Sequence, residues 1–145
     1  MDTNVVSEVT KARPHPSVIA WIDAQEFTLL FICTPVLAEL YYGLERLPHS
    51  ARQLRLKTWV DTLQTDLYTD RILPLDMAAA KEFGRVTAIR EKIGRRMEPM
   101  DALIAAIALA NRMALATRDT DDFADLGLDL INPFADAALT QSPPR

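Results

Sequence analysis

The hydrophobic positions of this chain follow two patterns in alternation, one typical of buried strands and one typical of helices. Residues 28–33, Thr-Leu-Leu-Phe-Ile-Cys, form a continuous apolar run of strand length, which indicates a strand covered on both faces. Shorter apolar segments predict further strands at 72–75, 114–117 and 128–131. Apolar residues at helical spacing predict helices at 16–24, 35–47, 51–67, 77–93 and 100–111.

Two of the predicted helices have a recognisable start. Thr34 before Pro35 is typical of an N-cap followed by the first helical residue, and Asp76 is a second N-cap. Because strands and helices alternate, the pattern predicts an α/β fold, a three-layer α/β/α sandwich with a mainly parallel central sheet. The 145 residues suffice for one domain, which we place at 1–134. The segment 135–145, ending in Ser-Pro-Pro-Arg, is expected to be a flexible tail.

The composition, with 49% hydrophobic and 25% charged residues, is that of an ordinary globular protein. No apolar run of about 18 residues is present, so no membrane span is expected, and the N-terminus lacks a signal-peptide pattern. The single cysteine, Cys33, excludes an internal disulfide bond and fits a reducing cytoplasm. Two histidines and one cysteine do not make a structural zinc site, so we expect a hard cation, Mg²⁺ or Mn²⁺, held by oxygen atoms.

The net charge of −4 provides no overall attraction to a nucleic acid. An RNA ligand would therefore depend on local basic patches and on the metal. The basic stretch at 90–96 has two interpretations, as a set of phosphate contacts or as a solvated loop of mixed charge.

Four acidic residues stand in or beside apolar segments, where an unpaired carboxylate is costly: Asp2, Glu39, Asp101 and Asp119. Asp2 and Asp119 are expected at the carboxyl ends of strands, whereas Glu39 and Asp101 are expected near the start of helices. In a parallel sheet these ends meet at one edge, which is where ligands bind. The four carboxylates are therefore expected to converge on one site.

Each acid also has a purely structural interpretation. Asp101 lies in the first turn of its helix, where the macrodipole favours an acid, and Glu39 fits a narrow polar stripe on a surface helix. Asp119 and Asp122 occur in a polar turn of a kind rich in Asp, and Asp122 either supports the site or caps a helix. Thr117 either orients a water molecule through its hydroxyl or is simply the residue that ends the strand.

Taken together, these segments resemble the PIN-domain nuclease family, and within it the VapC-like toxins of type II toxin–antitoxin systems. Each segment is unspecific by itself, but the set follows the family's order over nearly the whole chain. The resemblance is carried by Asp2-Thr3-Asn4-Val5-Val6-Ser7-Glu8, Thr34-Pro35-Val36-Leu37-Ala38-Glu39-Leu40, Glu98-Pro99-Met100-Asp101-Ala102, Ala116-Thr117-Arg118-Asp119 with Asp122-Phe123, and Leu130-Ile131-Asn132-Pro133-Phe134.

The resemblance implies an endoribonuclease that hydrolyses RNA phosphodiesters with Mg²⁺ or Mn²⁺ and leaves a 5′-phosphate and a 3′-hydroxyl. Asp2 and Asp101 fall on the positions most directly tied to the metal, while Glu39 and Asp119 complete the acidic pocket or a second ion site. Supporting roles fall on Asn4, Thr117 and Asp122.

The resemblance also implies partners. These are RNA as substrate, a cognate antitoxin protein whose C-terminal segment occupies the acidic groove, and a second copy of the chain in a homodimer. Operator DNA would be bound only through the antitoxin, and no membrane is involved.

Two alternatives are open. A Mg-dependent phosphatase that forms an aspartyl-phosphate typically has Asp-x-Asp after its first strand, whereas Asn4 stands two residues after Asp2. The other is a catalytically weak or silent PIN-like interaction module. The family places a short apolar strand before its first Asp, where this chain has only Met1. We therefore expect either a natural start a few codons upstream or a stub of strand one.

Overall fold

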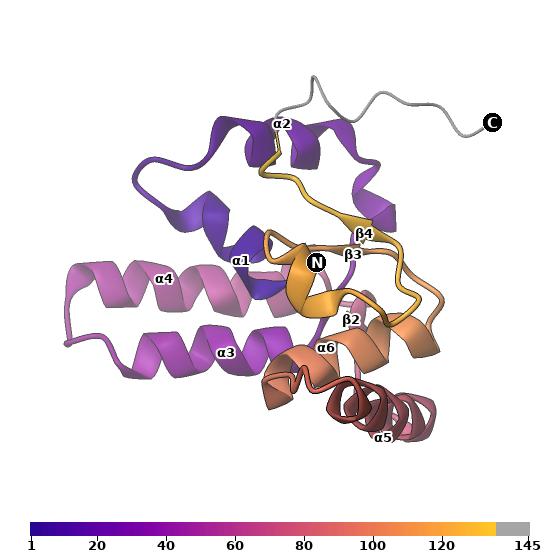
Figure 1. Ribbon diagram of the computed structural model, residues 1–145. Coiled ribbons are helices and arrows are strands. Elements are labelled where there is room, and N and C mark those ends of the chain that lie inside the picture. The colour runs from indigo at the N-terminus through magenta and orange to yellow at the C-terminus, as the bar shows by residue number, and fades with distance from the viewer. Residues whose placement is uncertain (136–145) are drawn as a thin grey trace.

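The computed structural model describes residues 1–135 and shows an α/β fold of short parallel strands and longer helices (Figure 1). β1 (Ile32–Cys33) pairs in parallel with β2 (Ile72–Leu73). β3 (Leu115–Ala116) pairs in parallel with β4 (Leu130–Ile131). The predicted parallel arrangement is therefore confirmed.

The first two residues of the chain join these strand pairs. The Met1 ammonium group donates a hydrogen bond to the Phe31 carbonyl, next to β1, at 2.8 Å. The Asp2 amide donates one to the Ala116 carbonyl in β3 at 2.9 Å. Met1 and Asp2 thus occupy the place of a central strand between β1 and β3, as in the predicted stub. Because the stub is bonded on both sides, Asp2 is held firmly at the carboxyl edge of the sheet.

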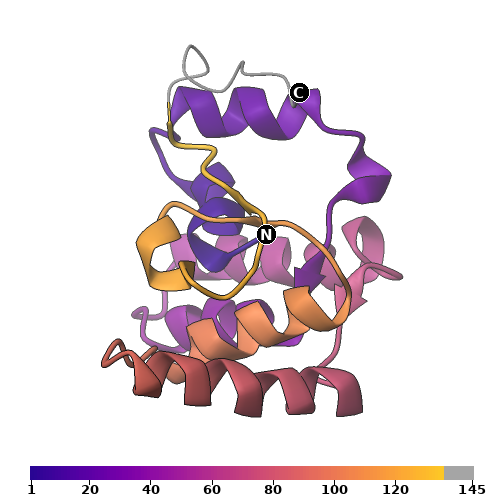
Figure 2. The ribbon, with the colours of Figure 1, turned by 45° about the vertical axis from the view of Figure 1, so that its right-hand side comes forward.

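Helices cover both faces of the sheet. α2 (Pro16–Ala24) lies on one side of the strands, and α5 (Met77–Lys92) lies with α6 (Pro99–Ala110) on the other (Figures 1 and 2). α6 is buried along most of its length because its own side chains are apolar on nearly every side. This arrangement confirms the three-layer α/β/α sandwich.

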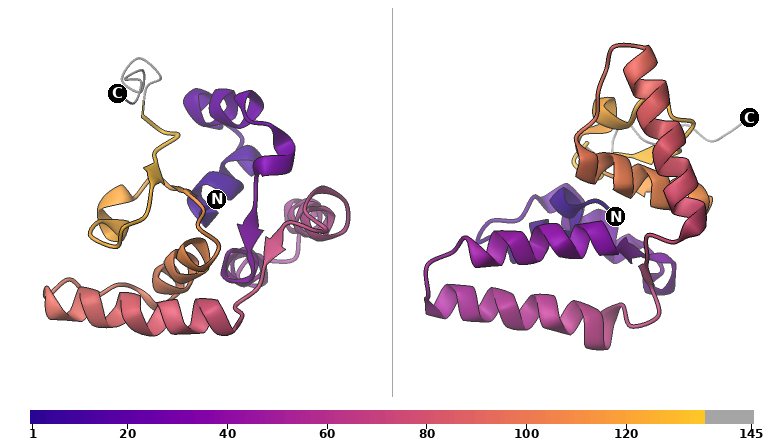
Figure 3. Two further views of the ribbon diagram at one scale, coloured as in Figure 1. Left: turned by 90° about the vertical axis from the view of Figure 1, so that its right-hand side faces the viewer. Right: turned by 90° about the horizontal axis from the view of Figure 1, so that it is seen from below.

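α3 (Thr34–Glu45) and α4 (Ala51–Thr62) form a helical hairpin that extends away from the strands (Figure 3). The Tyr41 hydroxyl in α3 donates a hydrogen bond to the Asp61 carboxylate in α4 at 2.9 Å. α4 continues into η3 (Leu63–Leu67), a π-helical turn, so the predicted helix at 51–67 is recovered as two joined elements. The hairpin positions the first turns of α3 beside the sheet edge.

The N-terminal segment consists of α1 (Thr3–Val6) and η1 (Ser7–Thr10), a 3₁₀ turn. Glu8 in η1 is only 3% exposed, yet its carboxylate accepts hydrogen bonds from the Lys11 ammonium group and from the His15 amide. Burial alone would raise the pKa of Glu8, but these two donors outweigh it and lower the pKa below its ordinary value. Glu8 therefore closes the loop that leads to α2.

Several predicted boundaries are wrong in detail. Only the last two residues of the predicted strand at 28–33 form β1, and Phe27–Leu29 forms a 3₁₀ turn, η2. The Leu29 side chain is 70% exposed, so this apolar run does not mark a strand covered on both faces. α3 starts one residue earlier than predicted, with Cys33 at the N-cap position instead of Thr34. The Asp76 prediction is confirmed, since its carboxylate accepts a hydrogen bond from the Ala79 amide at 2.8 Å.

The remaining predicted elements agree with the structure in type, but the strands predicted at 72–75, 114–117 and 128–131 are each only two residues long. Among residues 1–135, no helix is long and apolar enough to cross a membrane. The predicted tail at 135–145 lies, apart from Ala135, outside the described residues.

Candidate active site

An acidic pocket opens at the carboxyl edge of the sheet. Its cavity has a volume of about 190 Å³ and draws its lining from separate parts of the chain: Asp2, Thr3, Asn4, Glu39, Asp101, Asp119, Asp122 and Phe123. The stub and the segment after β3 deliver one acid each, Asp2 and Asp119. α6 delivers Asp101 from its first turn, and α3 delivers Glu39 from its second turn. The structure thus brings together all four acids that the sequence analysis selected, while their catalytic roles stay a prediction.

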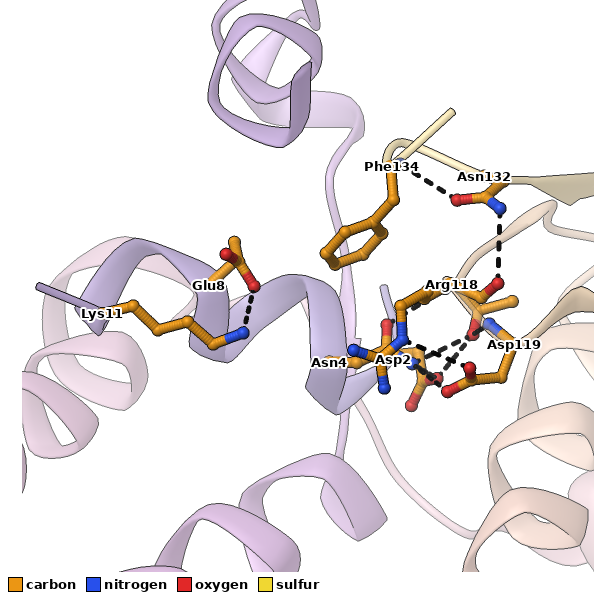
Figure 4. A network of polar contacts seen from close by, with 9 residues as sticks. Asp2, Asn4, Glu8, Lys11, Arg118, Asp119, Asn132 and Phe134 are labelled. Atoms are coloured by element: carbon orange, nitrogen blue, oxygen red, sulfur yellow. Dashed lines mark hydrogen bonds and ion pairs between the residues drawn. The ribbon is translucent and has the colours of Figure 1, made fainter. Parts of the chain in front are cut away.

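Asp2 has the most fully anchored carboxylate of the pocket and is only 5% exposed. Its Oδ1 accepts a hydrogen bond from the Thr3 amide at 2.6 Å. Its Oδ2 accepts one from Asn4 Nδ2 and one from Thr117 Oγ1, both at 2.7 Å (Figure 4). Three donors on two oxygen atoms fix the orientation of this carboxylate towards the cavity.

Asn4 links the two ends of the site. Besides its bond to Asp2, its Nδ2 donates to Asp119 Oδ2 at 3.1 Å. Its Oδ1 accepts a hydrogen bond from the Arg118 amide at 3.2 Å. One amide side chain therefore links the stub to the segment that follows β3, while the supporting role of Asn4 in catalysis stays a prediction.

Thr117 is fully buried, and its hydroxyl serves Asp2. Oγ1 donates to Asp2 Oδ2 and accepts a hydrogen bond from the Asp119 amide at 3.1 Å. Thr117 therefore does more than end the strand, because its hydroxyl holds a carboxylate that lies 115 residues away in the chain. The orientation of a water molecule by this hydroxyl stays a prediction.

Replacing Thr117 with Val should lower both stability and RNA cleavage. Valine keeps the shape but leaves Asp2 and the Asp119 amide without their partner, which costs about 1–3 kcal/mol of unfolding free energy. Loss of one of the three hydrogen bonds that orient Asp2 should reduce the RNA cleavage implied by the resemblance about tenfold. Chemical denaturation and a cleavage assay measure the two effects. Thr117→Ser, which keeps the hydroxyl, is the control and should retain most of the activity; equal activity in the valine variant would show that Asp2 does not need this bond.

Asp101 carries the least compensated charge of the pocket. Within residues 1–135 its carboxylate accepts no hydrogen bond, and Glu98, not Asp101, occupies the N-cap position of α6. Burial, followed by the negative charges of Asp2, Glu39 and other nearby acids, raises the pKa of Asp101 from 3.8 to about 6. Asp101 therefore lies in the first turn of α6, where the macrodipole favours an acid, but it does not cap the helix.

Glu39 and Asp122 complete the rim. The Thr3 hydroxyl donates a hydrogen bond to the Glu39 carboxylate, a contact that the sequence analysis did not anticipate. Its only sequence signal was the position of Thr3 between Asp2 and Asn4. Asp122 lies inside η4 (Thr120–Phe123), a 3₁₀ turn whose N-cap position is taken by Asp119, so the capping prediction for Asp122 is wrong.

The comparison with protein families decides the identity of this fold. Residues 1–128 match the model of the PIN domain. The chain belongs to the PIN domain family. The predicted resemblance is thereby confirmed.

Relatives of this PIN domain share nearly its full length. The plasmid stability protein StbB of Pseudomonas syringae pv. tomato is 39% identical, over 92% of this chain and 96% of its own. The VapC ribonuclease Y4jK of Sinorhizobium fredii is 36% identical, over 94% and 98%. The toxin FitB of Neisseria gonorrhoeae is 29% identical, over 94% and 98%. The VapC-like character that the sequence predicted is confirmed.

A solved structure of similar shape is that of FitAB bound to the IR36 DNA fragment. It superposes on this PIN domain with a TM-score of 0.86 at 28% identity, over 92% of this chain and 94% of that one. This agreement confirms the PIN fold.

The donor set of the pocket in this PIN domain fits a hard divalent cation. The ionisable groups that line it are carboxylates, which are the oxygen ligands that Mg²⁺ and Mn²⁺ prefer. Burial, and after it the negative charges of the neighbouring acids, raises the pKa of Asp101. Within residues 1–135, no three His, Cys, Asp or Glu side chains lie close enough to form a ready-made metal cluster. Carboxylates gathered in one pocket repel one another, and a bound cation would favour their ionised forms.

Two arginines of the basic stretch at 90–96 make structural contacts, while the exposed Arg96 pairs with Glu91, as in a solvated loop of mixed charge. Arg90 is 3% exposed and donates from Nε to the Arg95 carbonyl and from Nη1 to the Ala124 carbonyl. Arg95 Nη1 lies 3.2 Å from Asp125 Oδ2. These contacts fasten the end of α5 to the segment after η4. Neither interpretation from the sequence describes the buried Arg90.

Proposed function

We propose that this PIN domain is a Mg²⁺- or Mn²⁺-dependent endoribonuclease and acts as the toxin of a toxin–antitoxin pair. The observation that carries the proposal is the pocket itself, where Asp2, Glu39, Asp101 and Asp119 converge from four parts of the chain. Clustered acids are unfavourable without a counter-charge, which the raised pKa of Asp101 makes visible. The similarity to a VapC ribonuclease and to the toxin FitB supports the same function.

The residues of the pocket divide the work between them. Asp2 and Asp101 would hold the cation, and Glu39 and Asp119 would complete the site. When bound, the cation supplies Lewis-acid activation of water and neutralises the charge that develops on the phosphate. Asp2 contributes a carboxylate that is already oriented, because its three hydrogen bonds exist before any ligand arrives. Asp101 contributes in its ionised form, which predominates above its pKa of about 6.

The reaction adds water across the phosphodiester. A hydroxyl group joins the phosphorus, the bond to O3′ breaks, and O3′ receives a proton. The products are a 5′-phosphate and a 3′-hydroxyl. The RNA backbone itself must approach an acidic pocket, so charge neutralisation at the pocket is a condition for binding as well as for hydrolysis.

The proposal includes partners and a compartment. A cognate antitoxin would block the pocket, a second copy of the chain would complete a homodimer, and operator DNA would be reached only through the antitoxin. The similarity to FitAB, which was solved as a complex bound to a DNA fragment, supports this assembly. The enzyme would act in the cytoplasm, where its RNA substrate is found.

An RNA cleavage assay with sequencing of the new ends tests the proposal. The parent protein should cut RNA only with Mg²⁺ or Mn²⁺, and Glu39→Gln should lose most of this activity because it removes a pocket charge. Asp23→Asn is the control, since Asp23 is an exposed acid in α2. Full activity in Glu39→Gln would refute the site, and no cleavage by the parent would favour the silent interaction module.

A further inference from the structure

Arg118 lies at the rim of the acidic pocket, immediately before Asp119. Its Nε donates to Asp119 Oδ1 at 3.2 Å, and its side chain is 52% exposed. Among the ion pairs of residues 1–135, this one alone involves a carboxylate of the pocket. The site therefore has one positively charged side chain of its own at its rim, that of Arg118.

Side chains from two distant segments fix the backbone of Arg118. The Arg118 amide donates to Asn4 Oδ1, and its carbonyl accepts a hydrogen bond from Asn132 Nδ2 at 3.3 Å. Asn132 Oδ1 in turn accepts one from the Phe134 amide at 2.9 Å. Figure 4 shows this network around Arg118. An arginine on an ordinary surface loop has no such support, so its position relative to the pocket is set by the fold.

The guanidinium group is held in position, but not all of its hydrogen-bond donors are used. Its central carbon lies 5.6 Å from the centre of the Phe134 ring, at cation–π distance. The Phe134 ring is itself packed against His15, with 5.5 Å between ring centres. Within residues 1–135, the two terminal amino groups of Arg118 donate no hydrogen bond. These are the groups that bind a phosphate as a fork.

We propose that Arg118 is the phosphate-binding residue of this site. When the substrate binds, a backbone phosphate of RNA replaces Asp119 as the partner of the Arg118 guanidinium group. The inference rests on the proposed ribonuclease function. An exposed arginine–carboxylate pair is worth little, so exchange of one partner for another costs little. The bound phosphate then lies beside the pocket acids, and these acids act on the neighbouring phosphate of the RNA.

The competing explanation is that Arg118 only neutralises Asp119. Arg95 provides a control, because its side chain is 49% exposed and it also pairs with an aspartate, Asp125, at 3.2 Å. Asp125 does not line the pocket. The two arginines thus have similar exposure and similar ion pairs. They differ in their place relative to the pocket.

The test measures the binding of a fluorescently labelled single-stranded RNA with Mg²⁺ present, at several salt concentrations, in an Asp101→Asn background that should not cut it. Arg118→Ala should weaken binding about tenfold and reduce the slope of log affinity against log salt by about 0.7, the value for one lost phosphate contact. Arg118→Lys should restore the slope, and Arg95→Ala should bind as the background does. Circular dichroism confirms that each variant is folded.

Three outcomes would overturn the inference. If Arg118→Ala binds with the affinity and slope of the background, Arg118 makes no phosphate contact. If adding Asp119→Asn to Arg118→Ala restores binding, Arg118 acts only as a counter-ion. If neither the parent nor the Asp101→Asn background binds RNA, this inference and the proposed function fail together. If RNA binding depends on Arg118 as expected but the parent cuts no RNA, the proposed function fails alone.

Discussion

Replacing Asp101 with Asn should abolish RNA cleavage and, at the same time, stabilise the protein in the absence of metal. Asparagine has nearly the same shape but carries no charge, so it removes the cost of holding a carboxylate near Asp2 and Glu39. A pKa of about 6 in place of 3.8 corresponds to about 3 kcal/mol, which we reduce to about 1 kcal/mol because the side chain is partly exposed. This should raise the melting temperature by about 3 °C. Cleavage should fall roughly a thousandfold.

The pH dependence of this stabilisation is a stricter check. The folded state binds the Asp101 proton more tightly than the unfolded state does, so the parent gains stability from this group at low pH and loses it as the pH rises from about 4 to about 6. The difference in unfolding free energy between Asp101→Asn and the parent should therefore be small at pH 4 and complete by pH 7. Chemical denaturation in EDTA at both pH values measures it. Asp129→Asn, an exposed acid at the end of the loop before β4, is the control. A destabilised Asp101→Asn variant at pH 7 would mean that the carboxylate is structural.

Metal affinity should fall about tenfold for each pH unit below 6. A cation requires the ionised form of Asp101, and below its pKa of about 6 a proton competes for the same oxygen atoms. Above pH 7 the affinity should change little, because Asp101 is then already ionised. Titration calorimetry with Mn²⁺ between pH 5 and 8 measures this dependence. Repeating it in buffers of different ionisation enthalpy counts the protons that are released.

The Asp101→Asn variant shows whether Asp101 or another pocket residue is the group that titrates. Its residual Mn²⁺ affinity should be weaker and should lose the pH dependence between 5 and 7, because the group that titrates in this range is gone. Affinity that still falls tenfold per pH unit in this variant would assign the titration to another residue of the pocket.

The sequence predicted the helices well because their signals are local. Asp76 caps α5 as expected, and α6 is buried because it is apolar on nearly every side. The strands were predicted less well. An apolar run such as 28–33 looks the same whether its residues pair with a neighbour or form a turn, and only the two residues that find a partner in β2 become a strand.

The candidate site was also predicted only in part from the sequence. The sequence by itself determined which acids stand out, since a carboxylate in an apolar segment is visible in the residue order, and the alternation of strands and helices placed them at one edge. Residues whose role depends on a single distant contact were missed or misread. Arg118 stands between two residues that the sequence singled out, but Asn132, which holds its carbonyl, lies 14 residues further on.

Asp2 shows most clearly what only the tertiary structure decided. In the sequence it is an acid near the end of the chain, with one residue before it. In the fold its amide bonds to β3, and its carboxylate bonds to Thr117, 115 residues away. The raised pKa of Asp101 likewise exists only when four separate segments meet. The residue order specifies which charges are present, but hydrogen bonds and repulsion act through space, so the fold determines which carboxylate is anchored and which one holds its proton.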